Sequence, residues 1–165
     1  MIFVTVGAQM PFDRLVKTVD QWASKRGRDD VFAQIGLTDY HPTSIQWVPF
    51  LSPEEFKQRY DAAKVIVAHA GTGSIITALQ LGKPILIMPR RASLRETRND
   101  HQVATSEHFR SFDSVEVALD EKELIISLDG IDNLHGCQAI ELYASRELVG
   151  AIKEFINDVE INSTA

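Results

Sequence analysis

Residues 65–74 read Val-Ile-Val-Ala-His-Ala-Gly-Thr-Gly-Ser, and this stretch decides how the chain folds. An apolar run ends in two glycines and two hydroxyl residues, and a helical pattern begins directly afterwards at Ile75 and Ile76. The pattern predicts a strand, a tight turn and a helix. The free N–H groups of the first helical turn would then form a site for a phosphate or another anion. The alternative is a turn in which the glycines serve only to allow a sharp bend and no anion binds. Such a turn would have the same local sequence.

The same alternation of strand and helix patterns continues in both directions. Strands are predicted at 2–6, 31–35, 44–48, 64–69, 84–88 and 113–117. Helices are predicted at about 11–25, 53–61, 73–82, 100–109, 120–127 and 136–157. The continuous apolar runs at 65–67 and 85–87 indicate burial on both faces, which is typical of a parallel sheet covered by helices. We therefore predict an α/β fold, a Rossmann-like parallel sheet with helices on both faces.

Length and composition predict one domain. The 165 residues suffice for a single core, and no repeat or linker interrupts them. We predict a domain over 1–157 and a polar C-terminal tail over 158–165. The last helical pattern carries an apolar stripe that either faces the chain's own core or docks a partner. The stripe consists of Ile140, Tyr143, Ala144, Leu148, Ile152, Phe155 and Ile156.

Charge and composition exclude several classes of protein. The net charge of −6 argues against general nucleic-acid binding. No apolar run approaches the roughly 20 residues that span a bilayer, and residues 1–6 fit a first strand better than a signal peptide. A single cysteine, Cys137, excludes an internal disulfide and fits a reducing compartment. We expect a cytoplasmic location.

Common catalytic and nucleotide motifs are absent. The third glycine of a dinucleotide fingerprint is missing, and Gly82-Lys83 is followed by Pro84 instead of the Ser or Thr of a phosphate-binding P-loop. Ser74 has no G-x-S-x-G context, and Cys137 has no evident base nearby. The five histidines are scattered and no D-x-D occurs, so we predict no metal site and identify no catalytic residue.

Ligands of parallel sheets bind outside the carboxyl ends of the strands. Those ends are expected at 7–9, 69–74 and 89–91. We expect His69 to orient a ligand or the turn rather than transfer a proton. The loop after the fifth strand carries Arg90, Arg91, Arg95 and Arg98, which either form a positive patch for phosphates or belong to a solvated loop.

Three stretches, 62–74, 81–84 and 99–102, resemble the C-terminal, donor-binding half of glycosyltransferase family 28, which has the GT-B fold. Residues 3–15 are similar to the start of the small stand-alone subunits of two-part UDP-sugar transferases, which act in dolichol-linked and bacterial exopolysaccharide synthesis. The resemblance covers roughly residues 1–110. It implies that the sheet is equivalent to the C-terminal half of a GT-B enzyme.

The resemblance also implies a donor site. The two Gly turns would flank the UDP pyrophosphate, and His101 and Gln102 would contact the sugar. Thr77 stands where many relatives have a glutamate that holds the ribose, which leaves that contact weaker. The implied donor-binding residues are Gly7, Ala8, Gln9, His69, Gly71, Thr72, Gly73, Ser74, Thr77, Arg90, Arg91, His101 and Gln102.

By this resemblance the chain would be the donor-binding subunit of an inverting, metal-independent hexosyltransferase, with a UDP-sugar as co-substrate and no cofactor. It would act on a polyprenyl-diphosphate-linked acceptor. A membrane-anchored, acceptor-binding partner subunit would recruit it to the cytoplasmic face of the membrane and supply the general base. Two alternatives stay open: a non-catalytic subunit that stabilises its partner, and a self-sufficient homodimer acting on a soluble acceptor.

Overall fold

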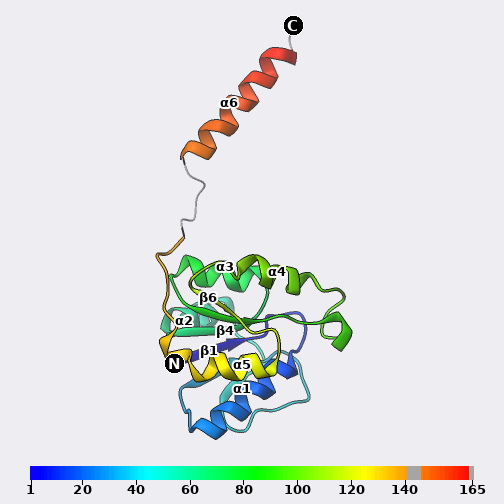
Figure 1. The fold of residues 1–165 in the computed structure, drawn as a ribbon, viewed down its shortest axis with the longest axis vertical. Coiled ribbons are helices and arrows are strands. Elements are labelled where there is room, and N and C mark those ends of the chain that lie inside the picture. The colour runs from blue at the N-terminus through cyan, green and yellow to red at the C-terminus, as the bar shows by residue number, and fades with distance from the viewer. Residues whose placement is uncertain (141–145, 164–165) are drawn as a thin grey trace.

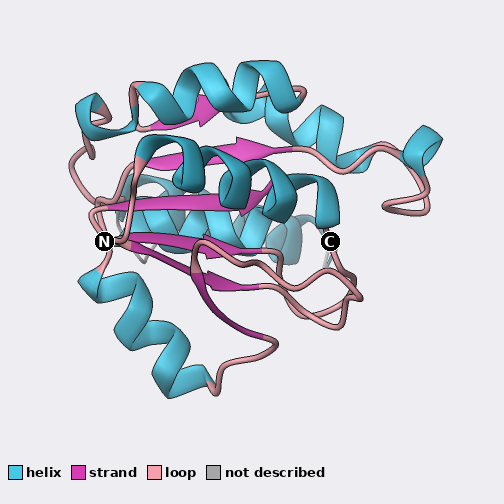
Figure 2. Cartoon of the chain, turned by 90° about the horizontal axis from the view of Figure 1, so that it is seen from below, coloured by secondary structure: helices cyan, strands magenta, loops and turns pink. Residues whose placement is uncertain are grey.

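The computed structural model describes residues 1–140 and 146–163, and within them the strands form one sheet (Figure 2). All neighbouring strands are parallel, and their order is β3-β2-β1-β4-β5-β6. The chain starts at the centre of the sheet and builds outward first on one side and then on the other. This topology confirms the Rossmann-like fold. The strands are β1 (Ile2–Thr5), β2 (Val31–Gln34), β3 (Gln46–Val48), β4 (Val65–His69), β5 (Ile85–Met88) and β6 (Val115–Val117).

Helices cover both faces of this sheet. They are α1 (Asp13–Arg26), α2 (Pro53–Ala62), α3 (Thr72–Gln80), α4 (His101–Phe109), α5 (Glu121–Asp129) and α6 (Arg146–Ser163), with short 3-10 turns η1 (Ala92–Leu94) and η2 (Ile131–Asn133). α1 and α5 pack on one face, and α2, α3 and α4 lie on the other (Figure 1). Successive β1 side chains alternate between the layers, because Val4 joins the α1 side and Phe3 the α2 side. Both faces are therefore buried, as the apolar runs predict.

Local sequence explains where several helices begin. Ser52 caps α2 and forms a reciprocal capping box with Glu55, so the predicted start at Pro53 is confirmed. Asp120 accepts hydrogen bonds from the backbone N–H groups of Lys122 and Glu123 and so starts α5. α1 begins at Asp13, two residues after its predicted start.

The prediction of one helix over 136–157 was wrong at both ends. Residues 136–140 are not helical, since the Ile140 N–H donates to the Leu79 carbonyl and Gly136 lies against Gly82, whose oxygen would be 1.9 Å from an added Cβ. These contacts hold the segment against the end of α3. Tyr143 and Ala144 lie outside the described residues. α6 begins at Arg146 and continues through Ser163, past the predicted end at 157, where we expected a polar tail.

Helix α6 projects from the rest of the molecule in Figure 1. The described side chains of its apolar stripe, Leu148, Ile152, Phe155 and Ile156, are exposed. In the structure these side chains therefore do not face the chain's own core, which was one of the two alternatives for the stripe. Among the helices in the described ranges, none combines the length and apolar character needed to cross a bilayer.

Candidate functional site

The carboxyl ends of β1, β4 and β5 are neighbours in the sheet, so the segments that follow them gather at one edge. A pocket of about 120 Å³ lies there. It is lined by Val6, Gly7, Ala8, Gln9, Met10, His69, Arg90, Thr97, His101 and Gln102. Seven predicted donor-binding residues are in this lining: Gly7, Ala8, Gln9, His69, Arg90, His101 and Gln102. The other six, Gly71, Thr72, Gly73, Ser74, Thr77 and Arg91, are not.

The turn after β1 is held by a buried glutamine at the end of β2. Gln34 donates from Nε2 to the carbonyls of Gly7 (3.1 Å) and Pro49 (3.2 Å), and its Oε1 accepts from the Thr5 hydroxyl at 2.7 Å. The same hydroxyl accepts from the Gly7 N–H at 3.2 Å. With φ at +77°, residue 7 also occupies a backbone region that favours glycine.

His69 lies between the two glycine turns. A Cβ at residue 7 would lie 2.8 Å from its Cε1, and a Cβ at Gly71 would lie 2.2 Å from its Nε2. In the described part of the chain, Nδ1 of His69 is a buried side-chain nitrogen without a hydrogen-bond partner. Burial, together with the nearby positive charge of Arg90, lowers the pKa of His69 to about 4. The ring is therefore neutral at physiological pH.

The first turn of α3 supplies the expected anion-binding geometry. No side chain caps this end, so its N–H groups are available to a ligand. A Cβ at Gly73 would meet nothing within 4 Å. The buried Tyr60 hydroxyl, on α2, donates to the Ser74 carbonyl at 3.2 Å and so holds this turn in place. Thr77 donates its hydroxyl hydrogen to the Gly73 carbonyl (2.8 Å), which leaves it able to accept, but not to donate, a bond to a ribose.

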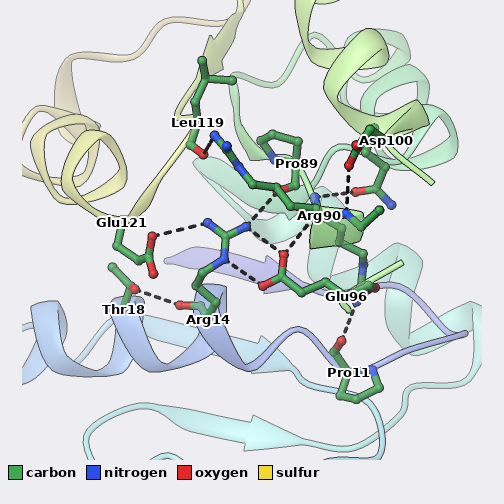
Figure 3. A network of polar contacts seen from close by, with 12 residues as sticks. Pro11, Arg14, Thr18, Pro89, Arg90, Glu96, Asp100, Leu119 and Glu121 are labelled. Carbon is green, nitrogen blue, oxygen red and sulfur yellow. Dashed lines mark hydrogen bonds and ion pairs between the residues drawn. The ribbon is translucent and has the colours of Figure 1, made fainter. Parts of the chain in front are cut away.

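Arg90 is buried, and its guanidinium donates to several backbone carbonyls. Its guanidinium donates to the carbonyls of Val6 (2.7 Å) and Met10 (2.6 Å) and stacks over the Phe12 ring. It also donates to the Pro11 carbonyl (Figure 3). Burial lowers its pKa to about 10, which still leaves it charged at neutral pH. Arg90 thus fastens the loop between β1 and α1 to the end of β5.

A second part of this network was missed by the sequence reasoning. Arg14 forms a bidentate ion pair with Glu96 (2.7 and 2.8 Å) and donates to the Pro89 carbonyl at 3.0 Å (Figure 3). The second Glu96 oxygen also accepts from the Arg91 N–H at 2.9 Å. No local spacing could reveal a pair that is 82 residues apart in the chain.

The four arginines of the expected positive patch differ in their contacts. The guanidinium of Arg90 points to the loop after β1, and that of Arg91 donates to the Leu119 carbonyl at 2.8 Å. Only Arg95 and Arg98, which are exposed, match the solvated alternative. Direct contact of Arg90 and Arg91 with a ligand stays a prediction.

The start of α4 closes the pocket. Gln102 is buried, and its Oε1 accepts from the Arg90 N–H at 3.1 Å, so the amide nitrogen is the end left for a ligand. His101 is exposed, and its Nδ1 contacts the Asn99 side chain. Lys83 of the 81–84 stretch lies elsewhere and donates to the carbonyls of Asp61 and Ala63 at the end of α2, which is a structural role. Within the described ranges, no three His, Cys, Asp or Glu side chains cluster as metal ligands would.

Comparison with known protein families identifies the family of this chain. The model of the glycosyltransferase family 28 C-terminal domain matches residues 1–135. The UDP-N-acetylglucosamine transferase subunit ALG13 of Yarrowia lipolytica (strain CLIB 122 / E 150) is 24% identical over 120 residues, which are 65% of this chain and 59% of that protein. The match therefore spans less than two thirds of this curated relative.

Solved structures share the fold. A solution NMR structure of ALG13 has a TM-score of 0.59 at 20% identity and covers 82% of this chain and 88% of its own. The MurG crystal structure from Acinetobacter baumannii has a TM-score of 0.60 at 17% identity, covering 79% of this chain and 41% of that enzyme. In fold, the chain thus corresponds to most of the ALG13 structure and to less than half of the MurG chain.

Proposed function

The chain belongs to the glycosyltransferase family 28 C-terminal domain family, and from this premise we propose that it is the donor-binding subunit of a UDP-sugar-dependent hexosyltransferase. The observation that carries the proposal is the pocket at the carboxyl edge of the sheet, beside the uncapped N-terminus of α3. A diphosphate at this helix end would meet N–H donors and the positive end of the helix dipole. The relative named for UDP-N-acetylglucosamine transfer supports uridine as the base.

We further propose that catalysis rests on positioning and on stabilisation of the departing UDP. The N–H groups of the first α3 turn would hold the developing negative charge without any rearrangement. The amide nitrogen of Gln102 would donate to the sugar, and Thr77 would accept from the ribose. In this proposal Arg90 acts mainly by holding the loop after β1, since three carbonyls already occupy its guanidinium. The transfer would be inverting and need no metal.

A partner subunit is part of the proposal. The pocket of about 120 Å³ is smaller than the roughly 300–1,000 Å³ of ordinary ligand sites, so a second surface would have to complete it. The exposed apolar stripe of α6 supports a docked partner. In this proposal the partner supplies the general base. It would bind a polyprenyl-diphosphate acceptor and hold the complex at the cytoplasmic face of the membrane.

Calorimetry with UDP, ADP and GDP tests the donor site. We expect UDP to bind most tightly and Gly73→Val to abolish binding while the domain stays folded, because the new side chain would enter open space needed by the phosphates. Gly150→Val is the matched control, since Gly150 is also a helical glycine with nothing within 4 Å of an added Cβ. Equal affinity for the three nucleotides, or no binding even with the partner, would contradict the proposal.

Transfer to a lipid-linked acceptor tests partner dependence. We expect the purified chain to be nearly inactive alone and active with a membrane-bound partner. Robust transfer by the chain alone would favour the homodimeric alternative. If the partner is active by itself and this chain only stabilises it, whether or not UDP is present, the alternative of a non-catalytic subunit would be favoured.

A further inference from the structure

Three glycines near the pocket differ in what surrounds them. The space beside Gly7 and Gly71, where a side chain would begin, is taken by the ring of His69 at 2.8 and 2.2 Å. The space beside Gly73 is open. Real Cβ atoms do not approach other atoms so closely, so a side chain at residue 7 or 71 would have to displace the imidazole. Two of the three glycines are thus required by a protein side chain and only the third leaves room for a ligand.

We propose that His69 is a positioning residue whose imidazole ring fills the space of two missing Cβ atoms and so holds the turn after β1 and the turn after β4 at a fixed separation. The inference rests on the proposed function, because these two turns flank the place where the donor diphosphate would bind. His69 links them from the end of β4, the strand that lies directly beside β1.

The state of the ring fits a role through shape rather than charge. Nδ1 is buried without a partner, and Arg90 nearby disfavours a second positive charge. A neutral imidazole attracts a diphosphate far less than the N–H groups of α3 do. His69 therefore acts on the ligand through the two turns.

A double-mutant cycle tests the packing. In the full chain, Gly71→Ala should lower Tm by about 5 °C or more, because the Cβ meets the ring while the backbone at φ −89° suits alanine. Gly71→Ala combined with His69→Ala should have the Tm of His69→Ala alone, since the collision is gone. Gly73→Ala, the control, should leave Tm within about 1 °C. Additive losses in the double variant would overturn the proposal.

Ligand affinity and hydrogen exchange test the positioning. His69→Ala should stay folded, weaken UDP binding about tenfold or more, and speed amide exchange in residues 7–10 and 71–74 while the strands keep their protection. Unchanged UDP affinity would overturn the positioning role. If the wild-type chain, with its partner, binds no UDP, the proposed function fails, but the exchange rates still decide the present inference. Unchanged exchange in both turns would then overturn it.

Discussion

The two edges of the sheet use arginine in opposite ways. At the carboxyl edge, Arg90 is 3% exposed and donates to backbone carbonyls of a loop more than 75 residues away in the chain. At the amino edge, Arg26 is 56% exposed and pairs with Asp129, and Arg28 pairs with Asp30 and Asp132. The comparison teaches that burial and the kind of partner, more than charge, set what an arginine contributes.

The physical reason is solvation. The buried Val6 carbonyl cannot turn to water when it loses its donor, so removing Arg90 costs the desolvation of that carbonyl as well as the charge-assisted bonds to the partly buried Met10 and Pro11 carbonyls. An exposed carboxylate that loses its arginine is simply hydrated. The carboxyl edge therefore concentrates its stability in few side chains, and it is also the edge that holds the pocket. The amino edge spreads weaker contacts over its surface.

The largest expected effect is that of Arg90→Ala. We expect the free energy of unfolding to fall by about 3–5 kcal/mol, because three charge-assisted bonds are lost and the buried Val6 carbonyl stays unpaired. Arg90→Lys should lose about half as much. The neighbouring Arg91→Ala, which removes one bond to the Leu119 carbonyl, is the matched control and should cost about 1 kcal/mol. Urea unfolding measures all three. Equal losses for Arg90→Ala and Arg91→Ala would break the comparison.

An intermediate effect is expected from pH. The unfolded chain protonates His69 near 6.5, whereas burial and the Arg90 charge lower its folded pKa to about 4. The unfolded state binds more protons between these values, so stability falls by up to about 3 kcal/mol as the pH drops from 6.5 to 4. At the amino edge, hydrogen bonds from Arg28 lower the pKa of Asp30 and Asp132, so their contribution is lost only below about 3.8.

The difference in unfolding free energy between wild type and His69→Asn isolates this effect, because the carboxylates cancel. We expect that difference to change steadily between pH 6.5 and 4. A difference that stays constant over this range would show that the folded ring titrates like a solvated histidine. The two edges of the sheet would then not differ in how their stability depends on pH in this range.

The smallest effect is expected at the amino edge. Arg26→Ala should leave the urea midpoint unchanged within error, since both partners of its ion pair are exposed. Arg28→Ala is the comparison variant: Arg28 contacts two carboxylates and lies over the Trp22 ring, and its loss should cost at most about 1 kcal/mol. A midpoint shift for Arg26→Ala as large as that for Arg91→Ala would show that surface pairs here carry more stability than we infer.

The layers of the fold and the edge at which the pocket lies follow from local sequence patterns. Apolar runs of strand length, separated by helical patterns, predict a parallel sheet, and parallel strands bring their carboxyl ends together. The capping box at Ser52 and the strand-turn-helix at 65–74 are local signals, and the structure contains both. The resemblance to family 28 depends on such short stretches, so it can be recognised from the sequence alone.

Which groups face the pocket and which support it depends on contacts between segments that are distant in the sequence. Arg90 and Arg91 are adjacent in the chain but bond in different directions, and Gly71 and Gly73 differ in whether a histidine ring fills the space beside them. The Arg14–Glu96 pair joins segments 82 residues apart. Residues 136–140 have a helical sequence pattern but are not helical, because Gly136 packs against Gly82. Local patterns report propensity and burial, whereas the partner of a polar group depends on segments that only folding brings together.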